Sequence, residues 1–246
     1  MTFVAAPRRA EAWNSPAGAH WAAHRAGYDA RPAGVDDALF GAAAIVPGDR
    51  VLVVGCGAGA TTRIAARLAA PGQVVGVDVC APPLERARAD TAAEGVENAC
   101  YVCADAQAHP FPAGAYDVVV GRGGPMSLAG HAAALRDAAR ALRPGGRLAF
   151  VCPRPPGPHR EDPERVRETI REALAGFAEV RVVPVTVESS RGRDVPDAVE
   201  FLLSPLPGGA LPASRLAGPE EVLLPFAAGR GARALTGVWL VTAVRP

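Results

Sequence analysis

The sequence contains no lysine, because all 26 of its basic residues are arginine. This usage indicates a GC-rich genome, and we expect a bacterial origin. An excess of one charge is also missing, since 25 acidic residues leave a formal net charge of +1. Without a basic excess or a dense arginine run, the chain has no electrostatic footprint for a nucleic-acid backbone. We therefore expect no nucleic-acid partner.

Long apolar runs are absent as well. No window approaches the roughly 18 apolar residues of a membrane-spanning helix. The N-terminal residues carry no long apolar stretch behind their charges, as a secretory signal would. We therefore expect no membrane association and a cytoplasmic location.

Cysteine is scarce and odd in number, with five residues. We expect free thiols that pack as small hydrophobic groups. Cys100 and Cys103 form a Cys-x-x-Cys pair, but no second pair lies nearby to complete a zinc site. His20 and His24 stand four residues apart without an identifiable carboxylate partner, so we expect no metal centre.

The length of 246 residues fits one domain, and 49% hydrophobic with 21% charged residues is an ordinary globular composition. Between residues 50 and 187, short apolar runs alternate with alanine-rich stretches of helical period. This alternation predicts a Rossmann-like α/β fold: a mostly parallel sheet of seven strands with helices on both faces. The predicted strands are 51–54, 74–77, 100–103, 116–121, 147–152, 180–187 and 238–244.

Helices are predicted between these strands. After the first strand, Thr61 or Thr62 would cap a helix that places Ile64 and Leu68 on one face. A later alanine-rich helix would carry Leu135 and Leu142 one heptad apart and stop at residues 143–146. Further helices would begin at Pro82-Pro83 and at Asp162-Pro163, the latter with Val166, Ile170 and Leu174 at steps of four.

Two regions interrupt the alternation. Residues 1–45 are predicted to form a helical cap, and residues 188–235, punctuated by proline and glycine, an insertion or lid before the last strand. We expect both to cover the carboxyl ends of the strands, where open α/β sheets bind ligands. Residues 46–187 and 236–246 would form the cofactor-binding core of a single domain.

A glycine loop follows the first predicted strand directly. Gly55, Gly57 and Gly59 allow the backbone to approach a ligand that side chains would exclude. Asp78 stands 19 residues after Gly59, at the end of the next strand, where a carboxylate can accept both ribose hydroxyls. Dinucleotide folds favour the spacing Gly-x-Gly-x-x-Gly, so the spacing here favours a cofactor without phosphate.

Four segments in this order resemble the successive motifs of class I S-adenosylmethionine-dependent methyltransferases. They are Val51-Leu52-Val53-Val54-Gly55-Cys56-Gly57-Ala58-Gly59, Val75-Gly76-Val77-Asp78, Ala104-Asp105-Ala106 and Leu142-Arg143-Pro144-Gly145-Gly146-Arg147-Leu148. The segment that begins at Trp13 and the tail from Trp239 to Ala243 look like a bacterial subgroup related to quinone and small-molecule methyltransferases.

The resemblance implies S-adenosylmethionine as cofactor, S-adenosylhomocysteine as product, and a role for each matching residue. The expected cofactor contacts are Trp13, the loop residues Gly55, Cys56, Gly57 and Gly59, Asp78 on the ribose, Val79 on the adenine, Asp105 and Ala106 at its edge, and Gly121 and Arg122 near the reactive methyl. His24 and Tyr28 are the candidate proton acceptors. Arg122 could instead hold an acceptor carboxylate or be structural.

Two departures from the family pattern concern Val53, where relatives often carry an acid, and the short connection 153–162. The leading hypothesis is methyl transfer to an O, N or C nucleophile of a small molecule, in specialised metabolism. A methyltransferase-fold protein with a non-methylating binding or assembly role is the alternative, and a nicotinamide oxidoreductase is disfavoured by the glycine spacing. A homodimer is left open.

Overall fold

The computed structural model describes residues 33–122, 139–154, 162–192 and 232–246. The chain divides into two compact units, residues 1–35 with 186–236 and residues 36–185 with 237–246. Most of the expected cap, the expected insertion and the alanine-rich helix around Leu135 lie outside the described residues. The sheet and the helices described below belong mainly to the second unit.

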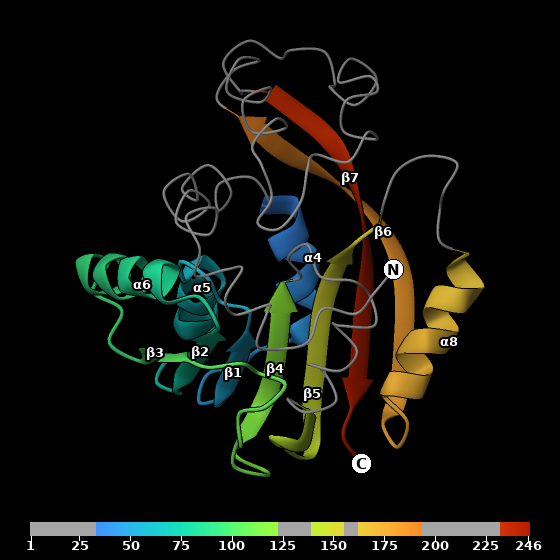
Figure 1. Ribbon diagram of the computed structural model, residues 1–246, viewed down its shortest axis with the longest axis horizontal. Coiled ribbons are helices and arrows are strands. Elements are labelled where there is room, and N and C mark those ends of the chain that lie inside the picture. Colours follow the sequence, from blue (N-terminus) through green and yellow to red (C-terminus); the bar gives the residue numbers. More distant parts are fainter. Residues whose placement is uncertain (1–32, 123–138, 155–161, 193–231) are drawn as a thin grey trace. The chain divides into compact units, whose positions relative to one another are not determined.

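Seven strands form one sheet in the order β3-β2-β1-β4-β5-β7-β6 (Figure 1). Strands β3, β2, β1, β4 and β5 are parallel to one another, and β7 runs antiparallel to β5. This confirms the predicted seven-stranded, mostly parallel sheet. The strands are β1 (Val51–Val54), β2 (Val74–Asp78), β3 (Ala99–Cys103), β4 (Tyr116–Arg122), β5 (Leu142–Pro153), β6 (Ala178–Gly192) and β7 (Ala232–Val244).

The described residues include the helices α4 (Ala33–Ala43), α5 (Ala60–Ala69), α6 (Ala81–Ala93) and α8 (Pro163–Ala173). Two of them begin as the sequence predicts. Helix α6 carries proline in its first turn. Helix α8 starts after Asp162, whose side chain accepts the backbone N–H of Glu164. Helix α8 also turns Val166 and Ile170 inward, as their spacing predicts.

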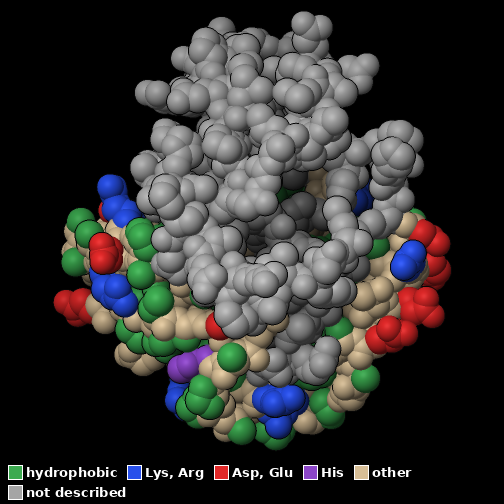
Figure 2. Space-filling model, viewed as in Figure 1, with side chains coloured by type: hydrophobic (Ala, Val, Ile, Leu, Met, Phe, Trp, Pro, Cys, Tyr) green, Lys and Arg blue, Asp and Glu red, His purple; other side chains and the backbone are tan. Residues whose placement is uncertain are grey.

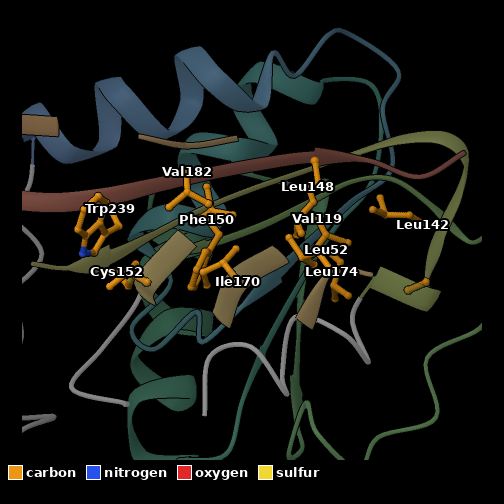
Figure 3. Close-up of a cluster of buried hydrophobic side chains, with 14 of the residues drawn as sticks. Leu52, Val119, Leu142, Leu148, Phe150, Cys152, Ile170, Leu174, Val182 and Trp239 are labelled. Carbon is orange, nitrogen blue, oxygen red and sulfur yellow. The ribbon is translucent and has the colours of Figure 1, made fainter. Parts of the chain in front are cut away.

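The main hydrophobic cluster lies between the sheet and α8 (Figure 3). Because successive side chains of a strand point to opposite faces, Leu52, Val119 and Phe150 share one face, and they pack with Ile170 and Leu174. All five side chains are at most 3% exposed. Burial of this apolar area ties α8 to the sheet.

Helix α5 packs on the opposite face, against a glycine of β2. A Cβ at Gly76 would lie 2.7 Å from Thr62 Oγ1 and 3.0 Å from Cys56 Cβ, so the helix approaches the strand closely. The expectation for this helix was wrong in two respects. Gly59 caps it without a side-chain bond, and its buried residues are Thr61, Thr62, Ala65, Ala66 and Ala69, whereas Leu68 is 41% exposed.

The expected position of Leu142 was also wrong. Leu142 opens β5 and pairs with Tyr116, and the register then shifts before Val118 pairs with Arg147. The turn with Gly145 and Gly146 is therefore an irregularity within the strand pairing and not a helix stop. At Gly146 a Cβ would lie 2.7 Å from the Arg143 carbonyl oxygen, so only glycine fits this turn.

In the described part of the chain, no helix is long and apolar enough to cross a membrane. On the face shown in Figure 2, the charged side chains of the described residues are of both signs and interspersed. Within those residues, this face presents no continuous basic stripe of the kind that a nucleic-acid backbone would need.

Candidate functional site

The order of the strands reverses at β1, which is a topological switch point. Strands β2 and β3 follow on one side of β1, and β4 and β5 on the other. Val54 at the end of β1 pairs with Val77 of β2 and with Gly121 of β4. The glycine loop, Asp78 and Arg122 therefore leave neighbouring strands at the same edge of the sheet, where open α/β sheets bind ligands.

The loop residues Gly55, Gly57 and Gly59 all have positive φ angles, of 70°, 52° and 86°. Residues other than glycine reach this region only with strain. At the start of the loop, the N–H groups of Gly55 and Cys56 both donate hydrogen bonds to the Val77 carbonyl oxygen, at 2.9 and 3.1 Å. Its backbone path thus requires glycine at each of the three positions, and β2 sets where the loop begins.

Asp78 holds the middle of this loop. Its Oδ2 accepts the N–H of Gly57 at 2.8 Å, and its Oδ1 accepts the N–H of Cys80 at 3.0 Å. A carboxylate offers about four acceptor positions, so each oxygen keeps a lone pair after these bonds. The sequence pattern predicted a ribose ligand for Asp78 and missed its role in holding the loop.

Gly55 and Gly59 have different surroundings. Gly55 is exposed, and a Cβ there would meet no atom of the described residues within 4 Å. A Cβ at Gly59 would lie 2.5 Å from Tyr101 Oη and 2.9 Å from Ala87 Cβ. Gly59 is thus required by protein packing, and Gly55 borders open space.

Tyr101 is a further residue that the sequence pattern missed. Its hydroxyl lies 2.7 Å from Thr91 Oγ1, which joins β3 to α6 beside Gly59. Burial raises the pKa of the Tyr101 phenol, against the opposing effects of the Thr91 hydrogen bond and the Arg63 charge. The phenol therefore stays protonated at neutral pH.

The residues expected around an adenine follow β2 and β3. Val79, Asp105 and Ala106 are each half-buried. A hydrogen bond joins the end of β3 to β2, because the N–H of Ala104 donates to the Asp78 carbonyl oxygen at 2.9 Å. Asp105 Oδ1 accepts the N–H of Gln107 at 2.9 Å. The structure thus brings all three residues to the same edge of the sheet as Asp78.

At the end of β4, Arg122 forms an ion pair with Asp36 of α4. Its Nη1 lies 3.1 and 3.0 Å from the two carboxylate oxygens, and the side chains of Arg122 and Asp36 are only 14% and 11% exposed. This pair anchors α4 to the edge of the sheet, which favours the structural interpretation of Arg122. Gly121 is buried, and its Cβ position would lie 3.2 Å from the Phe150 ring.

Three expected site residues lie outside the described residues, namely Trp13, His24 and Tyr28. The described residues contain no group of three or more side chains suited to bind a metal. All five cysteines are free. The expectation of buried cysteines was correct for Cys56, Cys80 and Cys152 and wrong for the exposed Cys100 and Cys103, which lie on the edge strand β3.

Comparison with known proteins agrees with this arrangement. A family model described as a methyltransferase domain matches residues 52–150. The chain is 37% identical over 109 residues to aklanonic acid methyltransferase of Streptomyces sp. strain C5. This match covers 44% of this chain and 50% of that protein. It is 32% identical over 163 residues to demethylmenaquinone methyltransferase of Thermus thermophilus. That match covers 63% of this chain and 72% of the Thermus protein.

Among solved structures, the YcgJ protein of Bacillus subtilis superposes with a TM-score of 0.60 at 18% identity, over 85% of this chain and 97% of that one. This likeness shows the shared fold. The chain spans about half the length of several curated relatives that it matches. Because the match to the Thermus protein covers most of that relative and the domain model falls on the glycine loop and its strands, the chain belongs to the class I S-adenosylmethionine-dependent methyltransferase family.

Proposed function

We propose that the protein transfers the methyl group of S-adenosylmethionine to an O, N or C nucleophile of a small molecule. The observation that carries this proposal is the loop from Gly55 to Gly59, held by Asp78 at the switch point of the sheet. In a member of this family, such a loop is the expected seat of the cofactor.

The residues present fit this cofactor by their chemistry. Gly55 borders open space, so a ligand can lie against the loop backbone. Asp78 keeps acceptor capacity for a ribose diol. Arg63, the arginine nearest to the loop in sequence, bonds the Ala58 carbonyl and Glu94. Helix α5 does begin directly after the loop, but Arg63 is already engaged and the glycine spacing is not that of dinucleotide folds, so a ligand without phosphate suits this set better than a dinucleotide.

The relatives support a small organic acceptor. Their names specify aklanonic acid and demethylmenaquinone as the compounds that those two proteins methylate. These acceptors differ from each other, so the methylated atom of this chain's own acceptor is a separate question. We propose a small organic acceptor, from specialised metabolism.

When bound, S-adenosylmethionine supplies an electrophilic methyl group on a sulfonium. The loop from Gly55 to Gly59 and Asp78 would hold this group at the switch point, so that an acceptor atom could take the methyl carbon from sulfur while the acceptor's proton left to a base or water. Positioning can supply much of the acceleration, since oriented reactants reach effective molarities of about 10⁵–10⁸ M. His24 and Tyr28 remain the proposed bases.

Transfer of label tests this proposal. The protein is incubated with S-adenosylmethionine labelled in its methyl group and a panel of phenols, amines and quinones, and the products are separated. We expect label in at least one acceptor and formation of an equal amount of S-adenosylhomocysteine. A variant with Asp78→Ala is the matched control and should transfer little label.

Binding without transfer would favour the alternative, a methyltransferase fold in a binding or assembly role. It would appear as cofactor affinity in calorimetry together with no labelled product across the panel. Affinity for NAD(P) without affinity for S-adenosylmethionine would contradict both functions.

A further inference from the structure

Arg63 of α5 reaches back to the glycine loop. Its Nη1 donates to the Ala58 carbonyl oxygen at 2.9 Å, and its Nε lies 2.9 Å from Oε1 of Glu94. The Arg63 side chain is 11% exposed, whereas the Glu94 side chain is 39% exposed. The guanidinium is thus held between the loop and the end of α6.

This arginine is not explained by the helix that carries it. Arg63 lies in the first turn of α5, where the helix dipole disfavours a positive charge. That turn contains no acidic residue and no side-chain cap. Compensation comes instead from Glu94, 31 residues later in the chain, which caps the carboxyl end of α6. The charge is therefore placed to serve the loop and not the helix.

The loop is consequently held by groups of opposite charge at two peptide groups, which lie on either side of the Gly57–Ala58 peptide. The Asp78 carboxylate accepts the N–H of Gly57, and the Arg63 guanidinium donates to the carbonyl of Ala58. These two bonds fix the orientation of the backbone on both sides of Gly57 and Ala58. Both anchors depend on one segment, since Asp78 ends β2 and Glu94 ends the helix that follows it.

We infer that Arg63, oriented by Glu94, is a positioning residue of the cofactor site. It sets the Ala58 carbonyl, and with it the loop conformation that a cofactor meets, before binding occurs. A preorganised loop loses less conformational freedom on binding, which raises affinity. This inference rests on the proposed function, because it takes S-adenosylmethionine as the ligand of the loop.

The chain offers a matched control for a test. Glu94 Oε2 also pairs with Arg67, which is 53% exposed and lies one helical turn after Arg63. Arg63→Met removes the bond to Ala58, one ion pair of Glu94 and the interaction with Tyr101. Arg67→Met removes the other ion pair and leaves the loop bond intact.

The affinity for S-adenosylhomocysteine is measured by calorimetry for both variants, with thermal unfolding recorded in parallel. We expect Arg63→Met to weaken binding about tenfold, the scale of one charge-assisted hydrogen bond, and Arg67→Met to leave it unchanged. Arg63→Lys should restore only part of the affinity. Lysine keeps the positive charge, but its ammonium lacks the planar guanidinium that contacts both Ala58 and Glu94. Glu94→Gln should weaken binding in the same direction as Arg63→Met, and it tests the inference if Arg63→Met does not fold.

With a methyl acceptor in hand, Arg63→Met should raise KM for S-adenosylmethionine and leave kcat nearly unchanged, since the loop positions the cofactor and not the acceptor. A merely structural role would lower the unfolding temperature without this split. Equal affinities of Arg63→Met, Arg67→Met and wild type would overturn the inference about Arg63 and leave the proposed function standing. A wild-type protein that binds neither S-adenosylmethionine nor S-adenosylhomocysteine would instead overturn the proposed function.

Discussion

The three glycines of the loop look alike in the sequence and differ in what surrounds them. Gly55 borders open space, Gly59 packs on Tyr101 and Ala87, and Gly57 donates its N–H to Asp78. Their spacing predicted that a ligand approaches this backbone. It could not assign Gly59 to protein packing, because Tyr101 lies 42 residues away in the chain and reaches Gly59 only through the pairing of β3 with β2.

Gly55→Ala should weaken cofactor binding. The methyl would meet no atom in the part of the chain that the structure describes, but it would fill the space beside the loop where we place the ligand. Alanine at a positive φ costs about 1–2 kcal/mol, so the free energy of unfolding should fall by that amount. Calorimetry with S-adenosylhomocysteine and urea unfolding measure the two effects.

Gly176→Ala is the control for this strain. Gly176 also has a positive φ and open space around its Cβ position, and it follows α8, away from the loop. The two variants should lose similar stability, and only Gly55→Ala should lose affinity. Equal affinities in the two variants would show that no ligand lies against Gly55.

At the scale of elements, strands were easier to predict than helix faces. Continuous apolar runs mark buried parallel strands, and each predicted strand is present in the sheet. The face of α5 was misassigned because large apolar residues were taken as the buried ones. The helix instead buries its small residues, and Thr62 lies against Gly76, where the close approach leaves no room for a large side chain.

A pair of buried threonines tests how α5 and α6 are held. Thr62 Oγ1 has no hydrogen-bond partner within the described ranges, whereas Thr91 Oγ1 bonds the Tyr101 hydroxyl. A buried hydroxyl without a hydrogen-bond partner lowers the free energy of unfolding, and one that forms a hydrogen bond raises it. Thr62→Val should therefore raise the free energy of unfolding by about 1 kcal/mol, and Thr91→Val should lower it by about as much.

Urea unfolding of the two valine variants measures both changes under the same conditions. A loss of stability in Thr62→Val as large as that in Thr91→Val would contradict this account, because it would mean that the Thr62 hydroxyl is satisfied.

At the scale of the whole chain, motif order predicted more than any single contact did. The order of the glycine loop, Asp78 and the later strands along the chain predicted the parallel sheet and placed the expected cofactor site at the carboxyl ends of its strands. Pairs that join distant segments could not be predicted, since Asp36 and Arg122 are 86 residues apart and Asp49 and Arg147 are 98 apart. Nothing local in the sequence marks such partners. The acceptor is equally hidden, because methyl transfer relies on positioning and needs few dedicated side chains.

We propose that Asp78 binds the ribose of S-adenosylmethionine as well as the loop. Since Asp78→Ala would also release Gly57, loss of affinity in this variant alone does not isolate the ribose contact. The decisive measurement is calorimetric titration of wild type and Asp78→Ala with S-adenosylhomocysteine and with its 2′-deoxy analogue. Wild type should bind the analogue at least about tenfold more weakly than the parent compound, and Asp78→Ala should bind both alike. If wild type binds the two compounds equally well, Asp78 does not hold the ribose.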